Sequence, residues 1–277
     1  MIFQVFNVGA GSSALLTSPT HLRELVDLGG NVNWSPVTFA LSFGSLDSIF
    51  LTHHHGDHLR DLPNLPSTEP GLVSRRQLAG QYAEALRRSN SEEGQALASE
   101  FSARYDAWTP ASSERTSTQR WGLTRQTYYL SESQAAEVST SDNSMANNCS
   151  WVRLYQSPFG KILVPGDMEK EGMALLLRTH SSFATDVADT DVLVAPHHGH
   201  KSGFSVDLFR AMGRPSVALG STPKGDGHVD SRYSSDEFVR GVSDGVRTLR
   251  LLTTRQYGHM TVEFTGPRVF KLDTELT

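Results

Sequence analysis

Two histidine-rich segments constrain the fold of this chain more than any other feature. Residues 52–58 read THHHGDH and hold four histidines, and residues 197–200 read HHGH and hold three, out of 11 in the chain. Neutral imidazole is the commonest metal ligand in proteins, and imidazole combined with carboxylate suits zinc, manganese or iron. The sequence therefore predicts that the chain folds so that both segments contribute to one metal site.

The spacing within the first segment indicates which side chains converge. In an extended backbone, alternate side chains point to the same side, so His53 and His55 can reach one ion while His54 points away. A tight turn at the following glycine would then present Asp57 and His58 to a second ion.

The composition excludes several classes of protein. A length of 277 residues, with 38% hydrophobic and 20% charged residues, is that of one large or two small globular domains. Without a run of 18 apolar residues, no transmembrane helix is predicted, and residues 2–8 predict a strand in place of a signal peptide. The single cysteine, Cys149, excludes an internal disulfide framework and predicts a cytoplasmic protein without membrane attachment. A net charge of -5 does not favour nucleic-acid binding, so such a substrate would need a local basic groove or metal ions.

Local patterns predict short strands in both halves and most helices in the middle or late parts of the chain. Such an order indicates mixed sheets flanked by helices. Ser35, Ser202 and Ser234 are expected to cap helices. Strands are predicted at 2–8, 14–17, 22–27, 47–52, 151–156, 161–165, 191–195, 215–219, 247–253 and 259–264, and helices at 35–43, 57–62, 72–88, 92–105, 169–178, 202–212 and 234–242.

The stretch 70–146 differs in composition from the rest and is predicted to be an insertion with mobile parts. It would lie within a single domain spanning 1–277. Its arginines are expected either to line a substrate groove or to form a solvated helix face. The side chains that could contact a nucleic-acid strand by charge and stacking are Arg75, Arg76, Arg87, Arg88, Tyr105, Trp108 and Trp121.

Outside this insertion, the order of motifs resembles that of metallo-β-lactamase-fold hydrolases. It is most similar to the soluble hydrolase domain of ComEC-type DNA-uptake proteins. The resemblance implies an α/β fold, a four-layer αββα sandwich of two mixed sheets with helices outside. The motifs that carry it are Val8-Gly9-Ala10-Gly11, Asp27-Leu28-Gly29, the THHHGDH segment, Asn147-Asn148-Cys149-Ser150, Gly166-Asp167 and His197-His198-Gly199.

The resemblance also implies a site for two divalent ions, Zn²⁺ or Mn²⁺. Many enzymes of this fold supply a third histidine to the first ion from the middle of the chain, but here no histidine lies between His58 and His180. Asn147 or Asn148 takes that place, and we predict Asn148 as the ligand. An amide is a weaker, harder ligand than imidazole, so the first ion would be held loosely. The other implied ligands are His53 and His55 for the first ion, Asp57 and His58 for the second, Asp167 between them, and His197 or His198 for the second.

Paired divalent ions hold a hydroxide at neutral pH, because the pKa of a bound water falls from near 16 to about 7. Asp57 or Asp167 would orient that hydroxide. The leaving oxygen needs a proton or a cation, for which His200, Lys201 and His228 are candidates. Each of these three is alternatively a solvated loop residue.

The predicted activity is that of a metal-dependent hydrolase, a phosphodiesterase or nuclease acting on nucleic acid or another phosphodiester. A lactonase, thioesterase or other ester or amide hydrolase of the same fold is the alternative, which an apolar pocket would favour. A third hypothesis is a metal-stabilised interaction or effector protein with protein partners in an operon-encoded system. The ligand set argues against it, because a structural metal site closes its coordination sphere and needs no second ion.

Overall fold

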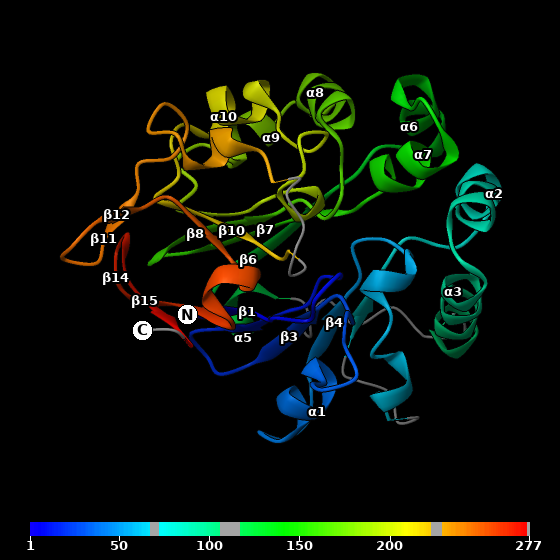
Figure 1. Ribbon diagram of the computed structural model, residues 1–277, viewed down its shortest axis with the longest axis horizontal. Helices are drawn as coiled ribbons and strands as arrows, with labels where there is room; N and C mark the ends of the chain where they lie inside the picture. The colour runs from blue at the N-terminus through cyan, green and yellow to red at the C-terminus, as the bar shows by residue number, and fades with distance from the viewer. Residues whose placement is uncertain (67–71, 106–116, 223–228, 276–277) are drawn as a thin grey trace.

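The computed structural model describes residues 1–66, 72–105, 117–222 and 229–275, which form two large mixed sheets (Figure 1). Within the first sheet, β4 runs parallel to β3 and to β5, and the other neighbours are antiparallel. Its seven strands lie in the order β15 (Val269–Thr274), β14 (Met260–Gly266), β1 (Ile2–Val5), β2 (Ala14–Thr17), β3 (Arg23–Val26), β4 (Ser48–Phe50) and β5 (Val73–Ser74).

The second sheet has six strands. Strands β13, β10, β9 and β8 are parallel to one another, β7 is antiparallel to β8, and β6 is antiparallel to β7. A separate two-stranded ribbon pairs β11 (Val242–Ser243) with β12 (Thr248–Leu249). The order of the second sheet is β13 (Leu251–Thr253), β10 (Val217–Gly220), β9 (Val192–Val194), β8 (Gly160–Val164), β7 (Val152–Ser157) and β6 (Thr124–Tyr128).

An apolar core holds the two sheets face to face. Phe3, Leu16 and Phe50 of the first sheet belong to the same buried cluster as Tyr155 and Val192 of the second. Burying a side chain of this size contributes about 1.5–3 kcal/mol, so this layer accounts for much of the stability.

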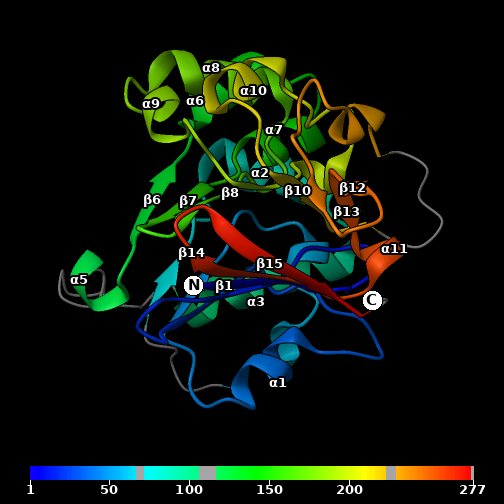
Figure 2. The same cartoon turned by 90° about the vertical axis from the view of Figure 1, so that its left-hand side faces the viewer.

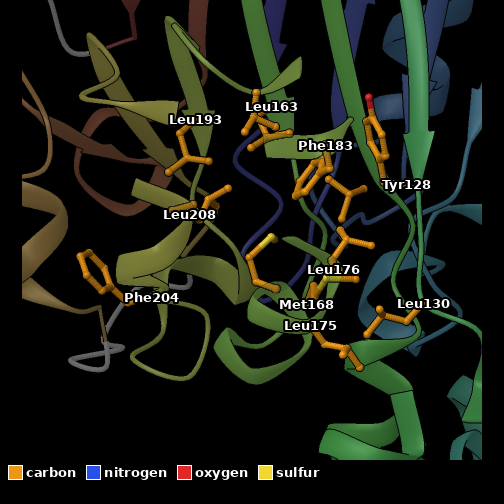
Figure 3. Close-up of a cluster of buried hydrophobic side chains, with 14 of the residues drawn as sticks. Tyr128, Leu130, Leu163, Met168, Leu175, Leu176, Phe183, Leu193, Phe204 and Leu208 are labelled. Carbon is orange, nitrogen blue, oxygen red and sulfur yellow. The ribbon is translucent and has the colours of Figure 1, made fainter. Parts of the chain in front are cut away.

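Helices cover the outer face of each sheet (Figure 2). On the first sheet, α1 (Pro36–Leu41) and α3 (Glu92–Tyr105) share a buried cluster with the outward side chains of the strands. On the second, α8 (Lys170–Thr179), α9 (Phe183–Asp186) and α10 (Val206–Met212) do the same, and Figure 3 shows Leu163 and Leu193 of the strands with helix residues such as Phe183. The predicted four-layer αββα sandwich of two mixed sheets is confirmed.

The remaining helices are short or lie at the periphery. Among the described residues, none of the helices has the length and apolar character needed to cross a bilayer. The remaining elements are α2 (Gly80–Ser89), α5 (Thr118–Trp121), α6 (Glu132–Val138), α7 (Asp142–Asn148), α11 (Thr254–Tyr257) and the 3-10 turns η1 (Gly56–His58), η2 (Leu62–Asn64), η3 (His197–Gly199) and η4 (Ser231–Ser234).

One predicted cap is confirmed and two are wrong. The Ser35 hydroxyl accepts a hydrogen bond from the Thr38 amide at 3.0 Å, and a proline follows as the first residue of α1. Helix α10 is instead capped by Ser205, because the Ser202 hydroxyl bonds two histidines. At Ser234 the chain ends a 3-10 turn and continues into turns, so the predicted helix 234–242 is absent.

The predicted helices at 57–62 and 72–88 are also partly wrong. The first is replaced by the 3-10 turns η1 and η2, and the second contains strand β5, which pairs with β4 in the register Ile49↔Val73. Pairing with a neighbouring strand overrides the helical spacing there, and α2 begins only at Gly80. Strands β5 and β6 both come from the segment 70–146, so it contributes a strand to each sheet. That segment's role as an insertion in one domain stays a prediction.

Candidate metal centre

The predicted ligands lie just past the ends of strands in both sheets. His53, Asp167 and His197 each lie three residues beyond the last residue of β4, β8 and β9, respectively. Loops at the carboxyl ends of strands are where open α/β sheets build their sites. The fold brings the two histidine segments together, as the sequence predicts: the His58 and His198 rings are 5.5 Å apart.

His53 and His55 turn ring nitrogens toward each other. The His53 Nε2 and His55 Nδ1 atoms are 2.9 Å apart, and His53 Nε2 lies 3.9 Å from Asp167 Oδ2. On the far side of the His53 ring, Nδ1 lies 3.2 Å from Thr52 Oγ1. That hydroxyl donates to the Asp27 carboxylate at 3.0 Å, so its oxygen accepts a hydrogen bond from His53 Nδ1–H. The Nε2 lone pair of His53 is thereby left facing the site.

His58 is oriented in the same way by a buried carboxylate. Its Nδ1–H donates to Asp27 Oδ2 at 2.8 Å, and a carboxylate behind an imidazole is the usual arrangement at metal-binding histidines. The opposite atom, Nε2, is buried without a hydrogen-bond partner among the described residues and lies 3.4 Å from Asp167 Oδ1. A buried, unpaired lone pair opposite a carboxylate is a fitting place for a cation.

His198 completes the ring of donors from the second segment. Its Nδ1–H donates to the Ser221 carbonyl at 3.0 Å, which leaves Nε2 at 3.3 Å from Asp57 Oδ2 and 3.5 Å from Asp167 Oδ2. His197 and His198 both adopt left-handed backbone conformations, with φ of 51° and 56°. Such conformations cost energy for residues other than glycine and are concentrated at functional sites.

Donor atoms of this kind lie within 4.8 Å of one another in two groups, one of His53, His58 and Asp167 and the other of Asp57, His58 and His198. Imidazole and carboxylate donors with their outer partners in place suit a divalent ion such as zinc or manganese. The allotment of each ligand to a first or second ion stays a prediction.

The electrostatic field of the site favours positive charge. Burial opposes protonation of His58 and His198, but the nearby carboxylates outweigh it, raising the pKa of His58 well above its usual value and that of His198 to about 10. Burial likewise opposes ionisation of Asp57 and Asp167, yet the facing imidazoles hold both pKa values below the usual range. In His53, burial and the neighbouring imidazoles lower the pKa, so that ring is a neutral donor.

His54 points away from this site, as the alternation along the backbone predicts. It is buried, with Nδ1 at 3.0 Å from the Tyr82 hydroxyl and its ring against Phe101. Burial and the charges of Arg75 and Arg76 lower its pKa to about 3, so it is a neutral side chain of the interior.

These two neighbouring histidines give a matched pair of variants. We expect His54→Ala to lower the free energy of unfolding by about 2–5 kcal/mol, as for other buried large side chains, while the bound metal per chain stays at the wild-type level. His53→Ala is expected to lose bound metal. Elemental analysis after dialysis measures the metal content of both variants, and urea denaturation measures the free energy of unfolding. Loss of an ion from His54→Ala but not from His53→Ala would show that His54, and not His53, binds metal.

The role of Asn148 as a ligand stays a prediction, and its side-chain amide already has partners inside the protein. Its Oδ1 accepts from the Glu169 amide at 3.1 Å, and its Nδ2 donates to the Ser139 hydroxyl at 3.0 Å. Asn147 lines the cavity beside Asp167, and its buried Oδ1 has no hydrogen-bond partner among the described residues. Asn147 is therefore another amide that can contribute to the site.

The other candidates from the second segment lie farther out. His197 Nε2 is 3.9 Å from Asp167 Oδ2, and its Nδ1 lies 2.7 Å from Ser202 Oγ. The same hydroxyl lies 2.9 Å from Nδ1 of His200, so His200 connects to the site through Ser202 and His197. Its role as a proton donor stays a prediction. His228 lies outside the described residues.

A cavity of about 310 Å³ opens over the predicted ligands. Its wall is largely polar, with Arg60 as the one arginine among the described lining residues. Beside the predicted ligands, the cavity is also lined by Ser89, Asn90, Ser91, Glu93, Leu97, Asn143 and Asn147.

The insertion's arginines do not form the predicted groove in the described part of the chain. Arg87 and Arg88 both pair with Glu84 on the exposed face of α2, which is the solvated-face alternative. Arg76 is buried and donates to the Cys149 carbonyl at 2.9 Å. Arg75 lies over the Phe101 ring.

The predicted stacking residues are unsuited to that role where they are described. Tyr105 and Trp121 are buried in the core, so neither can stack on a base. Trp108 lies outside the described residues.

The residues behind the ligands are harder to find from the sequence. Asp27 ends the predicted strand 22–27, where a carboxylate can either cap loop amides or reach into a site. It does both, accepting from the Thr52 amide at 2.8 Å and from His58. Its left-handed φ of 56° is not visible in the sequence. The Ser221 carbonyl behind His198 had no signal, because any residue can supply a backbone oxygen.

No protein-family model matches the chain, and no curated protein matches it. Several solved structures share its overall arrangement at low identity. An isothiocyanate hydrolase from Delia radicum gut bacteria is 11% identical, with 90% of this chain and 95% of that one covered and a TM-score of 0.46. A metallo-β-lactamase superfamily protein from Thermotoga maritima is 9% identical, with 91% and 98% covered and a TM-score of 0.43. A diphosphatase of the PhnP family is 11% identical, with 94% and 97% covered and a TM-score of 0.40.

Proposed function

We propose that this protein is a metal-dependent hydrolase that cleaves phosphodiesters. The observation that supports it most is the set of imidazole nitrogens around Asp167, each with its other ring nitrogen occupied by an outer partner. Divalent ions bound there would supply a hydroxide at neutral pH and neutralise charge on the oxygen under attack.

Residues at the cavity support a polar, anionic substrate. Asp57 is partly exposed at the cavity and lies beside His198, so it can orient a water molecule for attack. Arg60 is exposed at the cavity, where its guanidinium donates to the Ala10 carbonyl at 2.7 Å and has further N–H groups to offer. An arginine and several amide and hydroxyl groups suit an anionic, polar substrate, whereas a lactone or thioester would call for an apolar wall.

The ComEC-like motif order supports a nuclease in particular, and we retain that as the finer proposal. Tyr105 and Trp121 are buried, so two of the side chains predicted to stack on a nucleic-acid strand cannot do so. A single phosphodiester group placed in the cavity, with the rest of the substrate outside it, is therefore the form of recognition we propose.

Hydrolysis of bis-p-nitrophenyl phosphate, plasmid DNA and single-stranded DNA in Mn²⁺ or Zn²⁺ tests this function. We expect diester cleavage that a chelator abolishes and added metal restores. Hydrolysis of p-nitrophenyl acetate or a lactone without any diester cleavage would instead favour the carboxylic-ester alternative.

A variant pair checks the contribution of the cavity arginine to the same assay. Arg60→Ala is expected to raise KM for the diester, because the anion loses a charge-assisted partner, while metal content is unchanged. Arg210→Ala is the control, since Arg210 is exposed on α10 and pairs with Asp207. An equal KM for both variants would remove Arg60 from substrate binding.

A further inference from the structure

The turn between α2 and α3 lies against residues 52–58, called the histidine loop below. Ser89 is the last residue of α2, and its Oγ lies 3.2 Å from His55 Nε2. A Cβ atom built on Gly56 would come within 2.8 Å of Gly94 Cα, so the start of α3 packs against the loop too closely for any residue other than glycine at position 56.

The Ser89 hydroxyl selects one tautomer of His55. Its single proton is donated to the Ala85 carbonyl at 2.8 Å, so toward His55 the oxygen can only accept. His55 therefore carries its proton on Nε2. The lone pair is then on Nδ1, which is the atom 2.9 Å from His53 Nε2.

Asn90 holds the backbone on both sides of the same histidine. Its Oδ1 accepts from the Gly56 amide at 3.0 Å, and its Nδ2 donates to the His54 carbonyl at 3.0 Å. One side-chain amide thus spans the peptide groups that flank His55. These two bonds hold the backbone on both sides of His55.

We propose that Ser89 and Asn90 are positioning residues that aim the His55 Nδ1 lone pair at the metal centre. This inference rests on the metal site of the proposed function. Ser89 determines which nitrogen of the His55 ring carries the lone pair, and Asn90 fixes the backbone that positions the ring. Outer partners of this kind typically change metal affinity by about 10–100-fold.

The tautomer of His55 can be measured on the Zn²⁺-loaded protein by long-range ¹H–¹⁵N NMR of the imidazole nitrogens. We expect the proton on Nε2 in the wild-type chain, a loss of that preference in Ser89→Ala, and its recovery in Ser89→Thr, which keeps the hydroxyl. A wild-type ring protonated on Nδ1, or a tautomer unchanged in Ser89→Ala, would overturn the role of Ser89.

Metal affinity, measured by competition with a chelator for Zn²⁺ or Mn²⁺, tests both residues together. We expect a fall of about 10–100-fold in Ser89→Ala and in Asn90→Ala, with a changed visible spectrum of the Co²⁺-loaded protein. Gln95→Ala is the matched control, because the Gln95 amide donates to the Arg87 and Asn90 carbonyls of the same turn and, among the described residues, has no hydrogen bond to residues 52–58. An equal loss in the control, or wild-type affinity in both variants, would refute the positioning role.

The failure of one proposal can be distinguished from the failure of the other. A wild-type chain that binds neither Zn²⁺ nor Mn²⁺ would overturn the proposed hydrolase function and, with it, the positioning role. Normal metal binding with an unaltered His55 tautomer in Ser89→Ala would leave the proposed hydrolase function intact and refute the role of Ser89 alone.

Discussion

Replacing Asp167 by asparagine is expected to abolish metal-dependent hydrolysis and to lower bound metal per chain. Its carboxylate lies within 3.9 Å of ring nitrogens of His53, His58, His197 and His198, and no other carboxylate in the described part of the chain pairs with all four. Without this carboxylate, divalent ions would bind less tightly. The pKa of the attacking water would then rise from about 7 back toward its value of about 16 in bulk water. We expect a fall in rate of about 10³-fold or more, measured with bis-p-nitrophenyl phosphate.

A second buried aspartate supplies the control for this variant. Asp191 accepts from the Lys161 amide at 3.0 Å and from Arg268 Nε at 2.9 Å, away from the metal centre. Asp191→Asn should lose stability without losing metal, so comparison of the two variants separates binding from folding. Full activity and full metal content in Asp167→Asn would contradict the site as a whole.

The sequence predicts this site well where the answer depends on local alternation or on the end of a strand. The inward direction of His53 and His55 follows from a two-residue repeat, and the arrival of Asp167 follows from its place after β8. Both depend on a few neighbouring residues, whose geometry is nearly the same in any strand and turn.

The sequence fails where one residue of offset decides the outcome. Asn147 and Asn148 are adjacent at the end of α7, and which one faces the cavity depends on how that helix docks. Ser202 and Ser205 are equally good caps by composition, and the two histidines that bond Ser202 decide between them. Such choices are made by tertiary contacts that no local pattern encodes.

Contacts between distant strands were also beyond reach. Glu24 reads as an ordinary polar residue of a strand, yet it is fully buried at the interface of the two sheets. Its partners come from β6 and β7, more than a hundred residues further along the chain. A buried charge can be recognised only when its partners are known.

Glu24 joins the two sheets through a buried ionic network. Its Oε2 accepts from Ser48 Oγ at 2.6 Å and from Arg125 Nη1 at 2.8 Å, with Arg153 Nη2 at 3.3 Å, and its Oε1 accepts from the Tyr155 hydroxyl at 2.6 Å. Removing one member of such a network leaves opposite charges buried without a partner.

We expect Glu24→Gln to lower the free energy of unfolding by about 3–5 kcal/mol, measured by urea denaturation of metal-free protein. Arg125 and Arg153 would then face a neutral amide inside the protein. Glu100→Gln is the control, because Glu100 pairs with Arg104 on the solvent side of α3 at 2.8 Å. An exposed ion pair of that kind contributes about 1 kcal/mol or less to stability. Similar losses of unfolding free energy in the two variants would therefore show that the buried network stabilises the fold no more than an exposed pair does.

The same network predicts how the difference between wild type and Glu24→Gln depends on pH. Burial alone would raise the pKa of Glu24, but Arg153 and Arg125 outweigh it and hold that pKa below the ordinary 4.5. A carboxyl group whose pKa is lowered by folding stabilises the folded state fully above its unfolded pKa, and that stabilisation is lost as the pH falls through the folded pKa. The gap in unfolding free energy between wild type and variant should therefore be constant at neutral pH and narrow as the pH falls below about 4.5. A gap that widens on acidification would mean that Glu24 is protonated in the folded protein, and the two arginines would then need another counter-charge.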